Sequence, residues 1–275
     1  MAPQKTVLIT GATDGVGKVV AQRLAAQGAR VLLHGRSAEK GARVRDEIAR
    51  ATGNAQLVYY DADLASLAAV RALAASVALE NQRLDILINN AGIGRGPPQQ
   101  QTRAVSADGH ELRFAVNYLA GFLLTQLLLP KLRASAPARI VMVASAGQQA
   151  IDFDDVMLER GYEGVRAYRQ SKLAQIMYAM ELTERLAGAG VTVTSLHPST
   201  FMNTNMVREG GNAPITTVEE GADAILNLAL SPALEGKSGL YFDVQREVRA
   251  NPQAYDDVAR ERLWALSERL TGVTA

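Results

Sequence analysis

Apolar and polar positions along this chain follow two kinds of pattern. Short, mostly apolar runs have the length of strands, and the longer segments between them repeat apolar residues with the spacing of one helix face. The runs predict strands at residues 5–10, 30–34, 56–60, 85–89, 139–144, 191–196 and 239–242. The longer segments predict helices at residues 16–27, 38–50, 67–80, 111–133, 167–186, 218–230 and 252–270.

Strict alternation of strand and helix predicts the α/β class, with a mostly parallel, doubly wound, seven-stranded sheet and helices on both faces. The run from Ile140 to Val143 is apolar throughout, as a strand covered on both faces should be. Neither a flexible linker nor an internal repeat divides the sequence. We therefore expect residues 1–275 to form one domain.

Three irregular segments, at residues 92–109, 147–165 and 198–217, each follow the carboxyl end of an expected strand. Open α/β sheets bind their ligands at that edge. The last segment contains Phe201, Met202, Met206 and Val207, so we expect it to form an adaptable apolar lid over a substrate. The alternative is that these side chains pack the segment onto its own body.

Composition removes several classes of function. The chain has no cysteine, which excludes disulfides, thiolate nucleophiles and sulfur-ligated metal sites. Its 29 basic and 28 acidic residues are scattered, so there is no electrostatic footprint for nucleic acid. The three histidines lack spaced partners for a metal, and no G-x-S-x-G motif of a serine hydrolase occurs. A redox function would need a borrowed cofactor.

The first ten residues are too short an apolar stretch for a signal peptide, and no run approaches the length of a membrane span. The expectation is a cytoplasmic protein with no membrane or nucleic-acid partner.

Three glycines, Gly11, Gly15 and Gly17, lie between the first expected strand and the first expected helix. Glycines at such a turn allow backbone to approach a pyrophosphate, and the helix N-terminus supplies N–H groups and a positive dipole. The spacing is G-x-x-x-G-x-G rather than G-x-G-x-x-G, so the motif alone is also compatible with an ordinary loop. Its place between strand and helix favours a Rossmann-type dinucleotide site.

The end of the second strand predicts the choice of cofactor. An acidic residue there binds the ribose hydroxyl of NAD, whereas an arginine accommodates the 2′-phosphate of NADP. This chain has Gly35 where the acid is expected, followed by Arg36. NADP is therefore the expected cofactor, with a solvent-exposed turn arginine as the alternative.

Tyr168 and Lys172 are four residues apart on an expected helix, which places them on one face. An adjacent ammonium favours the phenolate form of a tyrosine, as proton exchange near neutral pH requires. Ser145 follows the fifth strand, where its hydroxyl is suited to a substrate oxygen. The alternatives are a surface tyrosine packed on a lysine stem and a serine that caps a turn.

In chain order the sequence contains TGATDGVG at 10–17, DADL at 61–64, NNAG at 89–92, Asn117, Ser145, YRQSK at 168–172 and His197-Pro198. With these motifs in this order it resembles the short-chain dehydrogenase/reductase family, and within it the retinol-dehydrogenase-like branch. The flanking strands and helices extend the resemblance over nearly the whole chain.

The resemblance implies catalytic roles for four residues. Tyr168 would be the general acid in reduction and the base in oxidation, and Lys172 would hold the nicotinamide ribose. Ser145 would orient the substrate carbonyl, and the backbone of Asn117 would hold a water in a proton relay.

The resemblance also implies a set of cofactor contacts. The glycines would line the pyrophosphate, Asp63 would meet the adenine, and residues 90–92 would pass under the cofactor. Besides Tyr168 and Lys172, the expected cofactor-binding residues are Gly11, Thr13, Asp14, Gly15, Val16, Gly17, Arg36, Ser37, Asp63, Leu64, Asn90, Ala91, Gly92, Pro198, Ser199, Thr200 and Asn203. The alternatives are that Asp63 caps a helix and that Asn90 satisfies backbone between strands.

Two features depart from the family pattern. Ser199 and Asn203 occupy places where the family has Gly and a phosphate-binding Thr, and Thr204 is shifted by one. The spacing from Ser145 to Tyr168 is also long, because of the segment 148–165. Its carboxylates, Asp152, Asp154 and Asp155, are expected to belong to a solvated loop or helix cap rather than to a metal site.

Together these features predict an NADP(H)-dependent enzyme that moves hydride between the cofactor and a small-molecule carbonyl or alcohol. An aldehyde or ketone of hydrophobic character is the expected substrate. The alternative is a regulatory protein that binds the cofactor with weak catalysis, although such proteins commonly lose the catalytic side chains. The chain begins without an anchoring segment, unlike many retinol dehydrogenases, which weakens the case for a retinoid substrate.

Many relatives pair through the helix with the catalytic tyrosine and the helix before it. Here these are residues 167–186 and 111–133, and the latter is more apolar than one buried stripe requires. A homo-oligomer through these helices is the expectation, with residues 148–165 as the alternative cover for the same surface.

Overall fold

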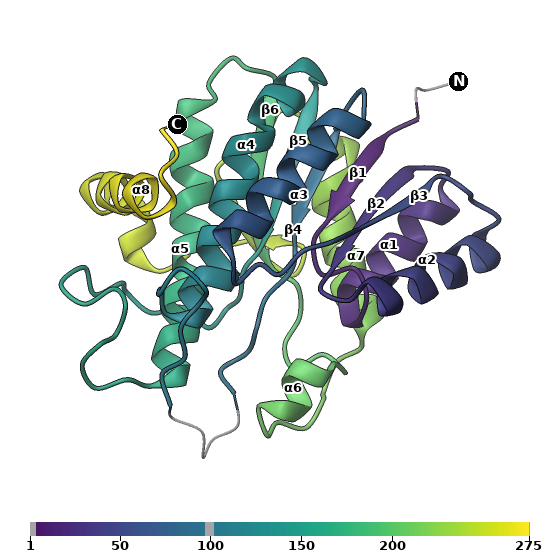
Figure 1. The fold of residues 1–275 in the computed structure, drawn as a ribbon. Coiled ribbons are helices and arrows are strands. Elements are labelled where there is room, and N and C mark those ends of the chain that lie inside the picture. Colours follow the sequence, from purple (N-terminus) through teal and green to yellow (C-terminus); the bar gives the residue numbers. More distant parts are fainter. Residues whose placement is uncertain (1–3, 97–101, 275) are drawn as a thin grey trace.

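The computed structural model describes residues 4–96 and 102–274. Their eight-stranded sheet has the order β3-β2-β1-β4-β5-β6-β7-β8, and the first seven strands are parallel (Figure 1). The strands are β1 Thr6–Ile9, β2 Arg30–Gly35, β3 Leu57–Asp61, β4 Ile86–Asn89, β5 Ala138–Val143, β6 Val191–His197, β7 Leu240–Asp243 and β8 Arg246–Glu247. All seven expected strands are present, with ends that differ by at most one residue. The expected count was one too low, because the antiparallel β8 has only two residues and leaves no pattern.

Helices cover both faces of this sheet, which confirms the predicted fold class (Figure 1). One apolar core lies under α1 Gly15–Ala26, α2 Ala38–Thr52 and α7 Val218–Leu230. The other lies under α3 Leu67–Glu80, α4 Ala120–Ala134, α5 Gly164–Arg185 and α8 Asp257–Thr271. β1 and β4 are buried along their whole length, as central strands between two helix layers must be.

Short irregular helices complete the chain. The expected helix at 111–133 is a π-helix, Phe114–Leu119, followed by α4, and the expected helix at 252–270 is a 3-10 turn, Pro252–Tyr255, followed by α8. The sequence pattern did not predict α6 Asn205–Glu209 or the 3-10 turn Pro232–Leu234, since both are shorter than two helical turns. Of the irregular segment 92–109, residues 97–101 lie outside the described residues.

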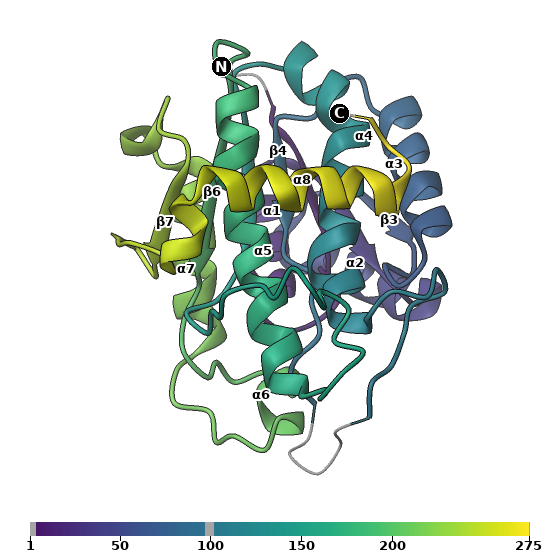
Figure 2. The ribbon, with the colours of Figure 1, turned by 90° about the vertical axis from the view of Figure 1, so that its left-hand side faces the viewer.

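α8 crosses the outer surface of α4 and α5 (Figure 2). The ring centre of Trp264 on α8 lies 5.4 Å from that of Phe122 on α4 and 5.7 Å from that of Tyr178 on α5. The guanidinium carbon of Arg185 lies over the same Trp264 ring, 4.0 Å from its centre. The apolar surface that the sequence assigned to a partner subunit is thus covered by the chain's own C-terminal helix. An apolar surface needs only one helix to cover it, and α8 supplies that helix, so this surface no longer argues for an interface. A homo-oligomer through these two helices stays a prediction.

The segment 148–165 is solvated in part, as expected, and packed against the body of the protein in part. The Asp154 side chain is 86% exposed, and the Asp155 side chain accepts from the backbone N–H groups of Glu159 and Arg160. Ile151 and Leu158 are buried. Gln253 holds both backbone groups of Ile151, and the carboxylates of Asp152 and Asp154 pair with arginines of α5 and α8. The buried apolar residues and the bonds from Gln253 therefore hold the segment on the body, and the largely exposed ion pairs add little to this.

The helical stretch Phe114–Ala134 is long and apolar enough to cross a membrane, which the sequence analysis did not anticipate. Within its most apolar window, 67% is buried inside the protein. Such burial is typical of a helix in the core of a folded domain.

We expect Trp264→Ala to lower the free energy of unfolding by about 3–5 kcal/mol, because it removes the ring that fills the contact between α4, α5 and α8. Denaturant unfolding measures this. Val258→Ala on the same helix is the control; Val258 is 74% exposed, so a change within about 0.5 kcal/mol is expected. Equal, small effects of both substitutions would contradict the packing role of α8.

Candidate functional site

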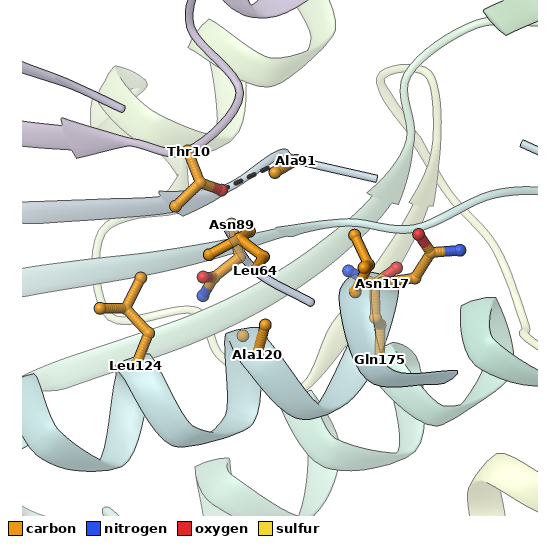
Figure 3. Close-up of a pocket in the computed structure, with 10 residues that line it drawn as sticks. Thr10, Leu64, Asn89, Ala91, Asn117, Ala120, Leu124 and Gln175 are labelled. Carbon is orange, nitrogen blue, oxygen red and sulfur yellow. Dashed lines mark hydrogen bonds between the residues drawn. The ribbon is translucent and has the colours of Figure 1, made fainter. Parts of the chain in front are cut away.

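The loops after β1 and β4 are joined side by side at the centre of the sheet. The hydroxyl of Thr10 accepts hydrogen bonds from the backbone N–H groups of Asn90 and Ala91, each at 3.0 Å. Figure 3 shows the bond with Ala91. The Asn90 side chain donates back to the carbonyls of Thr10 and Gly11, at 2.8 and 3.2 Å. Asn90 thus satisfies backbone between strands, as the sequence allowed, and fixes the crevice where strand order reverses.

The glycine loop has the shape that a dinucleotide phosphate needs. Gly11 and Gly15 have φ values of +68° and +49°, which favour glycine. A Cβ on Gly17 would lie 2.2 Å from the carbonyl oxygen of Gly11, so only glycine lets α1 begin this close to the loop. Gly15 is the first residue of α1, where backbone N–H groups and the helix dipole attract an anion. These residues therefore fit a pyrophosphate.

His34 is a structural member of the site that sequence reasoning did not identify. Its Nδ1 accepts from the N–H of Gly11 at 3.3 Å, and its Nε2 lies 3.1 Å from the carbonyl of Ala62. Both contacts are made by a neutral ring whose proton is on Nε2. Burial lowers the pKa of His34 to about 4, so the ring stays neutral and holds the glycine loop against the end of β3.

Asp14 connects the glycine loop to two other elements. Its carboxylate accepts from the N–H of Gly15 at 2.8 Å, from Lys40 of α2 at 2.7 Å and from Asn205 of α6 at 3.1 Å. The hydrogen bond from Lys40 is the main reason why the pKa of Asp14 lies below its usual value. Through Asn205, the expected lid is attached to the phosphate loop.

At the end of β2, the position expected for an acid is too crowded for one. A Cβ on Gly35 would lie 2.7 Å from the Thr13 side chain and 2.9 Å from the hydroxyl of Tyr59. Arg36 follows with an exposed side chain, for which no hydrogen bond or ion pair is found among the described residues. Ser37 caps α2 by accepting from the N–H of Lys40.

At the end of β3, the side chain of Asp63 accepts from the N–H of Ala65 at 3.0 Å and thereby shapes the turn before α3. The cap of that helix is Ser66, not Asp63. Asp63 is exposed beside the cofactor edge, whereas Leu64 is buried.

Asn117 lies in the π-helix, a geometry that recurs at functional sites because it displaces backbone groups from the α-helical pattern. Its side chain accepts from the N–H of Ile93 at 2.8 Å and donates to the hydroxyl of Ser171 at 2.9 Å. It thus joins the loop after β4 to the helix that carries the tyrosine. A Cβ on Gly92 would lie 3.2 Å from this side chain and 3.5 Å from the ammonium of Lys172, so glycine keeps that space open.

Ser145 and Tyr168 form the centre of the site. Ser145 is two residues past the end of β5, and its hydroxyl accepts from the N–H of Gly147 at 3.1 Å. Tyr168 lies near the start of α5. Burial raises the pKa of Tyr168, and a hydrogen bond with Ser145 lowers it by a smaller amount. The side chain is therefore a phenol, ready to donate a proton.

Lys172 is buried, and its ammonium donates to the carbonyl of Val143 at 2.9 Å and to the side chain of Gln175 at 3.0 Å. It lies 5.8 Å from the centre of the Tyr168 ring, and burial lowers its pKa to about 7. The expected lowering of the tyrosine pKa by this ammonium is absent here, because burial dominates at both groups. An ammonium has three donors, so one N–H beyond these two bonds is suited to a ribose hydroxyl.

Gln175 is a second residue that the sequence did not mark. Together with Asn89, Asn117 and Thr10 it lines a cavity of about 10 Å³, shown in Figure 3. This volume is close to that of one water position, and the polar lining suits one. The cavity lies beside the backbone of Asn117, where the resemblance implied a relay water.

The segment after Pro198 lies against the glycine loop, but not by the residue expected. Asn203 is exposed, and its side chain accepts a hydrogen bond from Arg208 of α6. Thr204 lies closer to the glycine loop, since a Cβ added to Gly15 would be 3.2 Å from its methyl group. The hydroxyl of Ser199 bonds to Thr216 within the segment, and that of Thr200 bonds to His197 at the end of β6. Thr204 therefore has the place nearest the phosphate loop, and contact of Asn203 with the cofactor stays a prediction.

Among residues 4–96 and 102–274, no group of three or more metal-ligating side chains is found. What the structure brings together is a phosphate-binding loop, a serine–tyrosine–lysine set and an asparagine at one edge of a parallel sheet. This arrangement defines a dinucleotide-dependent oxidoreductase, in which the protein supplies orientation and a proton.

Comparison with known proteins agrees with this class. Residues 5–214 match the family model described as short chain dehydrogenase. Human retinol dehydrogenase 13 is 40% identical, in an alignment that covers 99% of this chain and 86% of that protein. The chain belongs to the short-chain dehydrogenase family and is similar to its retinol dehydrogenases.

Solved structures show the same fold. A crystal structure of an uncharacterized protein from Mycobacterium paratuberculosis is 31% identical with a TM-score of 0.78, and the match covers 98% of this chain and 94% of that one. The NADP active-site complex of Pseudomonas aeruginosa RhlG is 30% identical with a TM-score of 0.71, covering 88% and 95%. The chain is thus an oxidoreductase that works with a nicotinamide cofactor.

We expect the stability of the protein to fall as the pH drops from about 6.5 towards 4, because the unfolded chain takes up a proton at His34 that the folded chain refuses. This contribution is complete above the unfolded pKa and amounts to at most about 3 kcal/mol. Thermal unfolding across this pH range measures it.

His34→Gln should flatten this part of the curve. His110→Gln, at a half-buried position away from the glycine loop, is the matched control and should leave the curve unchanged. The same pH dependence in wild type and His34→Gln would show that the buried ring is not its source.

Proposed function

We propose that this protein is an NADP(H)-dependent short-chain dehydrogenase/reductase that interconverts a hydrophobic aldehyde or ketone and its alcohol. The observation that carries the proposal is the convergence of Ser145, Tyr168, Lys172 and Asn117 at the carboxyl edge of the sheet. Ser145 and Tyr168 are neighbours there, since a Cβ on Gly147 would lie 3.5 Å from the Ser145 hydroxyl oxygen and 3.8 Å from the Tyr168 ring. These are the catalytic side chains that a purely regulatory relative would be free to lose.

In reduction, a nicotinamide cofactor held at this edge of the sheet would supply the hydride for the carbonyl carbon. Ser145 holds the substrate oxygen, and the Tyr168 hydroxyl gives its proton to that oxygen as it becomes an alcohol. Burial keeps Tyr168 protonated, which suits this direction. Lys172 would hold the cofactor ribose with its remaining donor. The proton that Tyr168 gives up in reduction is replaced from the Asn117 side of the site through Lys172. In oxidation Tyr168 acts as the base, and the proton leaves by the same route.

The choice of NADP over NAD rests on the end of β2. A Cβ on Gly35 would meet the side chains of Thr13 and Tyr59, so the acid that binds the ribose of NAD would have to displace them. Arg36 is exposed and without an ion-pair partner among the described residues, so its planar guanidinium is available to a 2′-phosphate.

The proposed substrate class rests on the lid. The side chain of Met206 packs against Gly94 in the loop after β4. A Cβ added to Gly94 would lie only 2.8 Å from the Met206 side chain. Phe201 and Ile215 add apolar surface, exposed by 43% and 68%. The similarity to human retinol dehydrogenase 13 makes retinal a suitable first probe beside aliphatic and aromatic aldehydes. We place the activity in the cytoplasm.

NADPH should bind at least about tenfold more tightly than NADH, which corresponds to about 1.4 kcal/mol. Arg36→Ala should remove most of this difference by weakening only NADPH, because it deletes the partner of the 2′-phosphate. Fluorescence titration measures both affinities. Arg43→Ala, which removes an arginine that is 71% exposed on α2, is the control and should change neither. Equal affinities of the wild type for the two cofactors would refute the assignment.

Tyr168→Phe should reduce turnover by about a hundredfold or more while NADPH binding stays nearly unchanged, because the lost hydroxyl acts on the substrate oxygen. Lys172→Ala should damage both turnover and binding. NADPH consumption with an aldehyde panel, together with the titration above, separates the two effects. If Tyr168→Phe kept more than about a tenth of wild-type turnover, the mechanism would be wrong, and NADPH binding without turnover in the wild type would favour a regulatory protein.

A further inference from the structure

The carbonyl of Ser145 is held by two side chains rather than by the sheet. β5 ends at Val143, and beyond it the hydroxyl of Tyr241 donates to the Ser145 carbonyl at 3.1 Å. The side-chain amide of Gln148 donates to the same oxygen at 3.0 Å. One peptide group next to the reacting centre therefore carries two hydrogen bonds from elements that the catalytic motifs do not include.

Tyr241 offers a fixed point for this contact. It is the second residue of β7, it pairs in register with Ser195 of β6, and its own carbonyl accepts from Val248 at 3.0 Å. The side chain is buried, and burial raises its pKa, so the hydroxyl remains a donor throughout the physiological pH range. Gln148 is fixed differently, because its side-chain oxygen accepts from the backbone N–H of Asn251 at 2.8 Å.

The direction of the Ser145 carbonyl determines where the next backbone groups lie. It sets the torsion between the α-carbon of Ser145 and its carbonyl carbon, and hence the course of the chain to Gly147. The N–H of Gly147 donates to the Ser145 hydroxyl oxygen, which leaves the hydroxyl hydrogen for other acceptors. Fixing the carbonyl thus orients the Ser145 hydroxyl. This hydroxyl lies beside Tyr168, since a Cβ on Gly147 would lie 3.5 Å from its oxygen and 3.8 Å from the Tyr168 ring.

We propose that Tyr241 is a positioning residue of the active site, which acts with Gln148 through the Ser145 peptide to aim the Ser145 hydroxyl at Tyr168 and the substrate oxygen. The predicted effect of Tyr241 on turnover rests on the proposed function. Its structural part, the effect of Tyr241 on Tyr168, is independent of any substrate.

The test compares Tyr241→Phe with Tyr178→Phe. Each substitution deletes one hydroxyl from a buried tyrosine whose hydroxyl has an uncharged partner, since Tyr178 accepts from Gln126 at 3.1 Å. Tyr178 lies ten residues beyond Tyr168 on α5, about 15 Å along the helix axis. Loss of a buried hydrogen bond is therefore common to both variants, and only one is next to Ser145.

With NADPH and whichever aldehyde of the panel the wild type reduces, Tyr241→Phe should lower kcat about five- to tenfold and leave the KM for NADPH unchanged. Tyr178→Phe should keep wild-type kcat, although both variants lose thermal stability to a similar extent. Gln148→Met, which removes the second donor, should lower kcat in the same way. It also replaces Tyr241→Phe as the test if that variant does not fold.

A measurement without turnover follows Tyr168 itself, by NMR of protein labelled with ¹³C at the tyrosine ring carbon that bears oxygen. The Tyr168 signal is assigned by its loss in Tyr168→Phe. In Tyr241→Phe its pKa should rise, because the hydrogen bond from Ser145 that lowers it is misaimed. In Tyr178→Phe it should not move.

The outcomes separate the two proposals. A wild type that reduces no probe overturns the proposed function, and the NMR titration still decides the role of Tyr241. A wild-type kcat and an unshifted Tyr168 signal in both Tyr241→Phe and Gln148→Met overturn the positioning role and leave the proposed function standing.

Discussion

The hydrogen bonds between Thr10 and residues 90 and 91 are the constraint on which the rest of the site depends. One hydroxyl accepts from two consecutive backbone N–H groups, and the Asn90 side chain returns two bonds to the loop after β1. The glycine loop follows Thr10 on β1's side of this contact. On β4's side, the loop continues to Ile93, whose N–H donates to the side chain of Asn117. This contact therefore fixes the phosphate-binding loop relative to the residues of proton transfer, although it touches neither cofactor nor substrate.

The chemistry of the site is set by burial more than by charge. No carboxylate bonds Lys172 among the described residues, and its two bonded partners are a carbonyl and an amide. Desolvation consequently moves the pKa of Lys172 down and that of Tyr168 up. In a site of this kind, the direction of the hydrogen bonds decides which proton moves. Uncharged residues such as Gln175 and Tyr241 therefore control proton transfer, which a charged pair would control in a more polar site.

The sequence predicted the parts of the fold that depend on local periodicity. The strands of the sheet and the long helices follow from it, while β8 and α6 are too short to leave a pattern. The position of α8 was not predictable in the same way, since the partner of Trp264 is formed by residues on two distant helices. Apolar excess on residues 111–133 was correctly seen, but periodicity does not tell whether a helix is covered by its own chain or by another.

The site divides along the same line. Ser145, Tyr168, Lys172 and the glycines stand in short motifs whose spacing carries their chemistry, so they were predicted from the sequence. His34, Gln175 and Tyr241 act through side-chain contacts that only the folded chain creates, and nothing near them in the sequence marks the role. Thr204 was one residue from the expected place, because the turn before α6, which it caps, displaces the segment.

The crossing of α8 over α4 and α5 has a consequence for the order of events during synthesis. α5 ends at Arg185 and α8 begins at Asp257, so the ribosome finishes the apolar surface around Phe122 and Tyr178 well before it makes the helix that covers it. At a translation rate of about 5–20 residues per second, this surface waits roughly 4 to 14 seconds for its cover. The nascent chain passes through an interval in which a chaperone or another nascent copy meets an aromatic surface that the finished protein never shows.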